Sequence, residues 1–119
     1  MFVKRIIEES PYFGQITTVI SGTANGVDQL GELWAKGQKP PIPIEQFPAQ
    51  WADLAAEGAK IKINKYGNKY NVLAGFQRNQ KMAEAADAAI IIIRQGSNGS
   101  EDMLERMNKL KKPVHVVRL

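Results

Sequence analysis

Residues 74–103, AGFQRNQKMAEAADAAIIIIRQGSNGSEDM, contain the features that decide the fold of this chain. The run Ala88–Ile93 ends in four consecutive isoleucines, and it contains no alternation of apolar and polar residues. Such a strand is typical of a parallel sheet that is covered on both faces. Helical patterns precede and follow it, and the small-residue loop Gly96–Ser100 leads into the second helix. Because such a loop presents backbone N–H groups at a helix N-terminus, the stretch predicts a site for phosphate or another anion.

The composition limits the classes of protein to consider. A chain of 119 residues that is 44% hydrophobic and 24% charged predicts one globular domain over residues 1–119. It has no cysteine and one histidine, which excludes disulfides, thiolate metal sites and multi-histidine metal centres, and we expect neither a metal nor a cofactor. No apolar run approaches the ~20 residues of a membrane span and no signal-peptide pattern is visible, so we expect a cytoplasmic location.

Hydrophobic periodicity along the chain predicts an α/β domain. Helices are expected at 2–9, from 27 or 28 to before 37, after 75 and over 103–110, with one or two helical turns over 51–57. Strands are expected at 16–20, 44–47, 88–93 and 114–119, with a basic hairpin or flap over 58–72. This alternation predicts a mostly parallel sheet. Ligands bind beyond the carboxyl ends of such strands, where both glycine loops are expected.

The loop Ser21–Asp28, SGTANGVD, is a second candidate for an anion site. Its glycines permit close approach of the backbone to a phosphate or ribose, and Asp28 suits a ribose hydroxyl. The alternative is an ordinary strand-to-helix turn with Asp28 as the N-cap. The candidate ligand-binding residues of this loop are Gly22, Thr23, Asn25, Gly26 and Asp28.

Residues on both sides of the isoleucine strand supply the other candidates. Arg78 can place a bidentate guanidinium at the mouth of the site, or it can form a surface salt bridge. Ser100 offers a hydroxyl to a phosphate, or it caps the next helix, where Glu101 and Asp102 favour the helix dipole. The candidate ligand-binding residues of this region are Arg78, Asn79, Gly96, Ser97, Gly99 and Ser100.

The remaining chemically active side chains give weaker signals. Trp51 suits stacking on a base and packing equally well. His115 lies in an expected strand without a partner carboxylate motif, so we expect a structural role. No Ser/His/Asp triad, metal-ligand cluster or Walker lysine is visible, and catalytic residues stay unassigned. The acidic residues close to the loops are Asp28, Glu101 and Asp102.

Five motifs occur in one order over nearly the whole chain. They are Ser-Gly-Thr-Ala-Asn-Gly-Val-Asp at 21–28, Phe-Pro-Ala-Gln-Trp at 47–51, Ala-Gly-x-x-Arg-Asn-x-x-Met at 74–82, Ala-Asp at 86–87 and Gly-Ser-x-Gly-Ser at 96–100. Together they resemble the YspA/YpsA-related branch of the SLOG superfamily, which also contains the Lonely-guy phosphoribohydrolases and the DNA-processing protein A family. The resemblance implies a Rossmann-like three-layer fold and a site for nucleotides or nucleotide-derived ligands. It implies no established reaction.

The chain departs from the family pattern in two places. Relatives usually begin with a strand that ends in Gly-Ser-Arg, and this normally central strand is missing before the helix expected at 2–9. We expect the absence of this strand to weaken the packing of the core and to remove part of the ligand site. Three explanations stay open: a truncated gene model, a fragment, or a second chain that fills the place of the strand. Lonely-guy enzymes also carry a glutamate at the position where this chain has Met103. A methionine side chain cannot activate water as a carboxylate can.

Three hypotheses of function follow. The first is binding or sensing of a nucleotide-derived small molecule, because two glycine loops accompany Arg78 without a complete acid–base set. The second is an N-glycosidase or phosphoribohydrolase that acts on nucleoside monophosphates through Arg78 and Asp102. The third is single-stranded nucleic-acid binding through residues 60–69, with Tyr66 and Tyr70 as stacking platforms; a solvated charged face is the alternative. We expect no membrane partner, and a homo-oligomer is compatible with each hypothesis.

Overall fold

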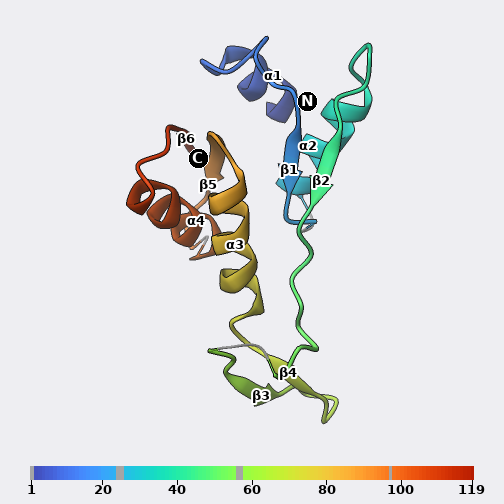
Figure 1. The fold of residues 1–119 in the computed structure, drawn as a ribbon, viewed down its shortest axis with the longest axis vertical. Helices are drawn as coiled ribbons and strands as arrows, with labels where there is room; N and C mark the ends of the chain where they lie inside the picture. Colours follow the sequence, from blue (N-terminus) through green and yellow to red (C-terminus); the bar gives the residue numbers. More distant parts are fainter. Residues whose placement is uncertain (1, 24–25, 56–57, 97) are drawn as a thin grey trace.

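The computed structural model describes residues 2–23, 26–55, 58–96 and 98–119, which form a mixed α/β domain (Figure 1). The helices in these residues are α1 (Phe2–Glu9), α2 (Val27–Lys36), α3 (Ala74–Ala85) and α4 (Asn98–Lys109). The strands are β1 (Val19–Ser21), β2 (Ile44–Gln46), β3 (Ile61–Ile63), β4 (Lys69–Asn71), β5 (Ala89–Ile93) and β6 (Val114–Arg118). The α/β class that the periodicity predicts is therefore confirmed.

The strands form three two-stranded sheets. β1 pairs in parallel with β2, with Val19 opposite Ile44, and β5 pairs in parallel with β6, with Ala89 opposite Val114. β3 and β4 form an antiparallel hairpin, as the basic segment 58–72 predicts. The parallel strands expected in one sheet are thus divided between two separate pairs.

The first strand is shorter than the five residues expected from its β-branched sequence. Its ladder begins where the N–H of Val19 donates to the carbonyl of Pro43 at 2.9 Å. Residues 16–18 precede this contact and lie outside the strand. Strand propensity alone does not set the boundary, because a ladder also needs a partner.

The helical turns expected over 51–57 are wrong for the described residues 51–55, which form turns without a helix. The carboxylate of Asp53 accepts the N–H of Ala55 at 3.2 Å. The carbonyl of Trp51 accepts the N–H of Asn71 at 2.7 Å. Both hydrogen bonds occupy groups that a helix would use, and this competition explains the difference. Residues 56–57 lie outside the described part.

Buried side chains form two clusters. The larger cluster consists of Val3, Ile7, Trp34, Ala35 and Ile92. Apolar side chains of both parallel pairs pack against it, those of Val19, Ile44, Ile90 and Val117 among them. The smaller cluster consists of Ala83, Ala86 and Met107. Side chains of the larger cluster therefore connect the two parallel pairs, which share no backbone ladder.

The isoleucine strand is buried as its sequence predicts. Ile91, Ile92 and Ile93 are 6%, 7% and 3% exposed. Helix α4 packs against this strand, and Ile92 contributes to the larger cluster. A strand without polar alternation is stable here because structure covers it on both faces.

We expect the Ile92→Ala variant to lose about 2–5 kcal/mol of unfolding free energy, because the substitution leaves a cavity between the parallel pairs. The same substitution at Ile63, which is 65% exposed, is the matched control, with an expected change within about 0.5 kcal/mol. Urea denaturation of both variants measures the difference. Equal losses would contradict a core that depends on Ile92.

Candidate functional site

Helix α3 brings the two glycine loops together. Arg78 and Asn79 lie one turn after the helix begins. Nη1 of Arg78 donates to the carbonyl of Gly22, directly after β1. Nδ2 of Asn79 donates to the carbonyl of Gly99, in the first turn of α4, at 3.1 Å. The loops that follow β1 and β5 therefore meet at two consecutive residues of α3.

Gly22 occupies a position where a side chain has no room. A Cβ atom there would lie 2.7 Å from Nη1 of Arg78 and 3.0 Å from Oδ2 of Asp28. The next residue, Thr23, has a φ of 61° and donates its N–H to Oγ of Ser21 at 3.1 Å. The glycine thus allows a guanidinium and a carboxylate to approach the backbone closely.

The other predicted loop residues lie at the starts of two helices. Gly26, with a φ of 89°, is the N-cap of α2, so the N-cap role considered for Asp28 is wrong and Asp28 lies in the first turn. Helix α4 begins at Asn98, so Ser100 lies inside the helix and does not cap it. Gly96 is exposed and has a φ of 81°. Two candidates lie outside the described residues, Asn25 and Ser97.

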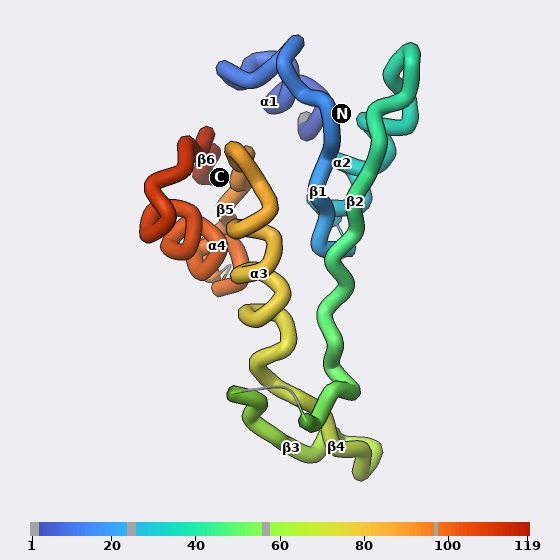
Figure 2. The backbone as a smooth tube through the Cα atoms, in the orientation of Figure 1, coloured from blue at the N-terminus to red at the C-terminus, as the bar shows by residue number. Residues whose placement is uncertain are grey.

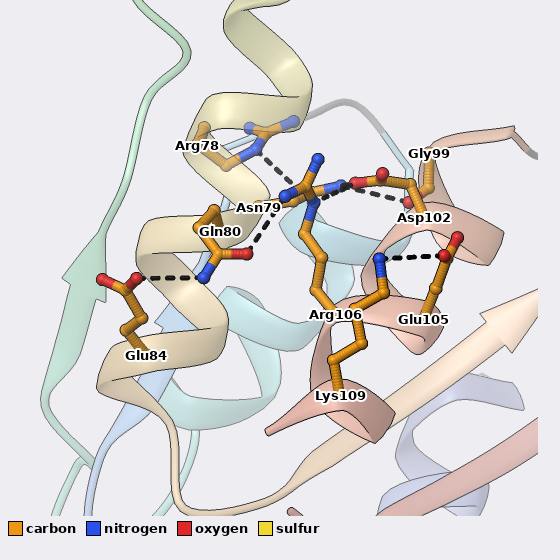
Figure 3. Close-up of polar contacts among 9 residues, drawn as sticks. All are labelled: Arg78, Asn79, Gln80, Glu84, Gly99, Asp102, Glu105, Arg106 and Lys109. Carbon is orange, nitrogen blue, oxygen red and sulfur yellow. Dashed lines mark hydrogen bonds and ion pairs between the residues drawn. The ribbon is translucent and has the colours of Figure 1, made fainter. Parts of the chain in front are cut away.

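A network of hydrogen bonds holds Asn79, which is 7% exposed (Figure 3). Its Oδ1 accepts Nε of Arg78 at 3.1 Å, and its Nδ2 also donates to Oδ2 of Asp102 at 3.1 Å. The same oxygen of Asp102 pairs with Nε of Arg106 at 2.8 Å. Arg106 in turn donates to Oε1 of Gln80 at 3.0 Å. Both ends of the buried amide are satisfied, and the amide fixes Arg78.

The acidic residues of α4 point in different directions. Glu101 pairs with Arg118 of β6 at 2.7 Å. Asp102 faces Asn79 and the glycine loops. Met103 packs against the smaller core cluster. The position at which Lonely-guy enzymes carry a glutamate therefore faces the core, and the adjacent aspartate faces the loops.

A pocket of about 200 Å³ opens beside the network. Trp51, which is 50% exposed, closes one side, since a Cβ atom at Gly75 would lie 3.4 Å from its Cη2. The same Cβ position is 3.9 Å from Nη2 of Arg78. The pocket combines an aromatic ring, a guanidinium and glycine backbone. Its lining residues are Trp51, Val72, Gly75, Phe76, Arg78, Asn79 and Gly99.

A larger depression of about 640 Å³ runs along α4. Its charged lining residues are Glu101, Asp102, Glu105 and Lys109. Lys109 is paired with Glu105 at 3.1 Å. An excess of carboxylates repels phosphate, so the smaller pocket at Arg78 is the better candidate for an anion.

The sequence analysis missed one carboxylate near the loops, that of Glu32. This side chain of α2 is 8% exposed, and it accepts Oγ of Ser21 at 2.7 Å and Nε2 of Gln46 at 2.8 Å. The hydrogen bond from Ser21, followed by that from Gln46, lowers the pKa of Glu32 below its ordinary value of 4.5. Glu32 thereby ties α2 to both strands of the first parallel pair. The polar Ser21 directly after a β-branched run was the only sequence signal for it.

Comparison of the chain with protein-family models, curated proteins and solved structures finds no match. The resemblance to the SLOG superfamily therefore rests on sequence motifs alone. None of the helices in the described residues is long and apolar enough to cross a membrane. Within the same residues, no three His, Asp or Glu side chains are grouped so that they could hold a metal ion. His115 lies in β6 opposite Ile90.

We expect Glu32→Gln to weaken the dependence of stability on acid. Because folding lowers the pKa of Glu32, its contribution is present above its unfolded value near 4.5 and disappears as the pH falls through the folded value. Wild type should thus lose more unfolding free energy than the variant between about pH 6 and about pH 3. Urea denaturation across this range measures the loss. Glu105→Gln removes a carboxylate from an exposed ion pair and is the control, which should show the wild-type dependence of unfolding free energy on pH. The prediction is refuted if Glu32→Gln and wild type show the same dependence.

Proposed function

We propose that the pocket at Arg78 binds the phosphate of a nucleotide or nucleotide-derived ligand. The observation that carries this proposal is the arrangement of the guanidinium. Its Nη1 and Nε are held by Gly22 and Asn79, whereas Nη2 lies toward Gly75 and has no hydrogen-bond partner among the described residues. A guanidinium that is held through Nε and Nη1 still offers the N–H groups of Nη2 to an oxyanion.

The surroundings of Arg78 support an anionic ligand of limited size. Gly99 lies in the first turn of α4, where backbone N–H groups and the helix dipole favour negative charge. The half-exposed ring of Trp51 offers a face for a base. The pocket volume of about 200 Å³ is below the range of roughly 300–1,000 Å³ for whole drug-sized ligands. It suits a phosphoribosyl group or a base, with the rest of the ligand outside.

We further propose that the domain is a SLOG-like, Rossmann-like three-layer fold. Two arrangements support this proposal. Both parallel pairs send their carboxyl-terminal loops to α3, as in open α/β sheets that bind ligands there. The larger core cluster also joins the two pairs.

The Arg78→Ala variant should bind nucleotides roughly 10- to 100-fold more weakly than wild type, because hydrogen bonds to charged groups contribute about 1.5–3 kcal/mol. Calorimetry with nucleoside monophosphates, ADP-ribose and cyclic dinucleotides measures the loss. Lys81→Ala removes the same charge from an exposed position of α3 and should bind as wild type does. The proposal fails if wild type binds no member of the panel or if the two variants bind equally.

We infer a second candidate function, N-glycosidase or phosphoribohydrolase activity on nucleoside monophosphates, from the position of Asp102. Its Oδ2 accepts from Asn79 and Arg106, and its Oδ1 has no partner among the described residues. A carboxylate beside the ribose could stabilise positive charge or activate water. Asp102 lines the depression along α4 and not the pocket at Arg78, so we rank this candidate second.

Chromatography of nucleoside monophosphates after incubation separates the two functions. The second candidate requires release of free base, which Asp102→Asn and Arg78→Ala should both abolish, whereas the first requires no release. Glu101→Gln is the matched control, since this neighbouring carboxylate pairs with Arg118. Absence of free base in wild type would remove the second candidate and leave the first intact.

A further inference from the structure

The hairpin β3–β4 lies at one end of the molecule, away from both parallel pairs (Figure 2). The molecule measures 45 × 28 × 26 Å, and its radius of gyration of 15.2 Å exceeds the value of about 13.5 Å for a compact chain of this length. Fully buried Asn71 fixes the base of the hairpin. Its side chain donates to Gln77 at 2.7 Å and accepts the N–H of Lys60 at 3.3 Å and of Leu73 at 3.1 Å. The hairpin is thus anchored to α3 at its base.

Asn64 shapes the turn at the tip of the hairpin. Its Oδ1 accepts the N–H of Tyr66 at 2.9 Å and of Asn68 at 3.0 Å, and its carbonyl accepts the N–H of Gly67 at 3.0 Å. The turn needs glycine at position 67, where φ is 82°. It presents Tyr66 with 76% of the residue exposed, and Nζ of Lys65 lies 5.1 Å from the ring centroid. A defined turn therefore displays an aromatic face beside a positive charge.

Lysines and a second tyrosine share one face of the hairpin. Lys62 lies opposite Tyr70, and the carbonyl of Lys60 accepts the N–H of Val72. Because side chains alternate along a strand, Lys60, Lys62 and Tyr70 belong to the same face. The segment 58–72 contains four lysines and no acidic residue. This excess of positive charge on an exposed arm attracts polyanions.

We propose that the hairpin binds single-stranded nucleic acid, with phosphates on its lysines and bases stacked on Tyr66 and Tyr70. Such binding uses aromatic rings among basic side chains, and the hairpin offers the exposed Tyr66 and the half-buried Tyr70. A membrane fits less well, because the exposed Ile61 and Ile63 share their face of the hairpin with Lys69 alone among the strand lysines. Lys60 and Lys62 lie on the other face and would point away from lipid headgroups. Val72, which pairs with Lys60 at the base of the hairpin, lines the pocket at Arg78, whereas the proposed binding uses the lysines and tyrosines of the hairpin and not Arg78.

Fluorescence anisotropy with labelled dT and U oligonucleotides of about 12 residues tests the proposal. For wild type, four lysine–phosphate contacts predict a slope of about −3 for the logarithm of affinity against that of salt concentration. The Lys62→Gln/Lys65→Gln/Lys69→Gln variant should reduce the slope by about 0.7 per lysine. Tyr66→Ala should weaken binding at least about fivefold. Thermal unfolding checks that each variant is folded.

The control removes the same charge at exposed positions elsewhere, in the Lys36→Gln/Lys81→Gln/Lys111→Gln variant. It should lose distinctly less affinity than the hairpin variant. Arg78→Ala should bind the oligonucleotide as wild type does, so the failure of one site is distinguishable from failure of the other. Any of three results would overturn the proposal. The two triple variants could lose affinity equally, or Tyr66→Ala could bind as tightly as wild type. The hairpin could also be required for binding to phosphatidylglycerol vesicles while no oligonucleotide binds.

Discussion

The arrangement of the glycine loops depends on one buried amide. Asn79 accepts from Arg78 and donates to Gly99 and Asp102, so it connects α3 to α4 and orients the neighbouring guanidinium. A buried polar group that loses its partner costs about 1–3 kcal/mol. Sliding of α3 along α4 would break several of these bonds at once. The buried amide therefore sets the register between the helices, and the position of Arg78 follows from it.

The same residues connect the two halves of the domain. The two parallel pairs share side-chain packing in the larger core cluster and no backbone ladder. Arg78 adds a polar contact from α3 to Gly22 of the first pair, and Asn79 adds one to the helix that packs on the second pair. A ligand bound at Arg78 would thus lie where the halves meet. Such a ligand would stabilise the folded arrangement by RT ln(1 + c/Kd), where c is its free concentration, so the stabilisation grows with the logarithm of the affinity.

Much of the fold could be predicted from periodicity, because burial on two faces and amphipathic spacing leave direct patterns in sequence. The isoleucine strand and the meeting of the two loops are examples, and the second follows from the geometry of parallel strands. Helix α2 shows the limit of this reasoning. Leu30, Leu33 and Trp34 recur at helical spacing, yet Leu33 is 60% exposed and the charged Glu32 is 8% exposed. The partners of Glu32 lie 11 and 14 residues away, and no local pattern encodes them.

The direction of a helix face likewise depends on tertiary contacts. Sequence spacing could state that Asp102 and Met103 point about 100° apart, but not which of them faces the loops. The buried Asn79 and the ion pair with Arg106 draw Asp102 toward α3, and Met103 then packs in the smaller cluster. The division of one sheet into two pairs was also beyond periodicity. A pattern of buried strands does not say which edges are paired.

We rank ligand binding above catalysis as the proposed function because of where the carboxylates lie. A general base must reach the proton that it removes, within hydrogen-bond distance or through one water. The Oδ2 atom of Asp102 is held by Asn79 and Arg106, and Asp102 lines the depression along α4 and not the pocket that Arg78 and Trp51 share. Arg78, by contrast, is oriented by two fixed acceptors and lines the pocket. The proposed recognition of a charged ligand would use the part-buried contacts that hold Arg78, and no carboxylate among the described residues lines the pocket.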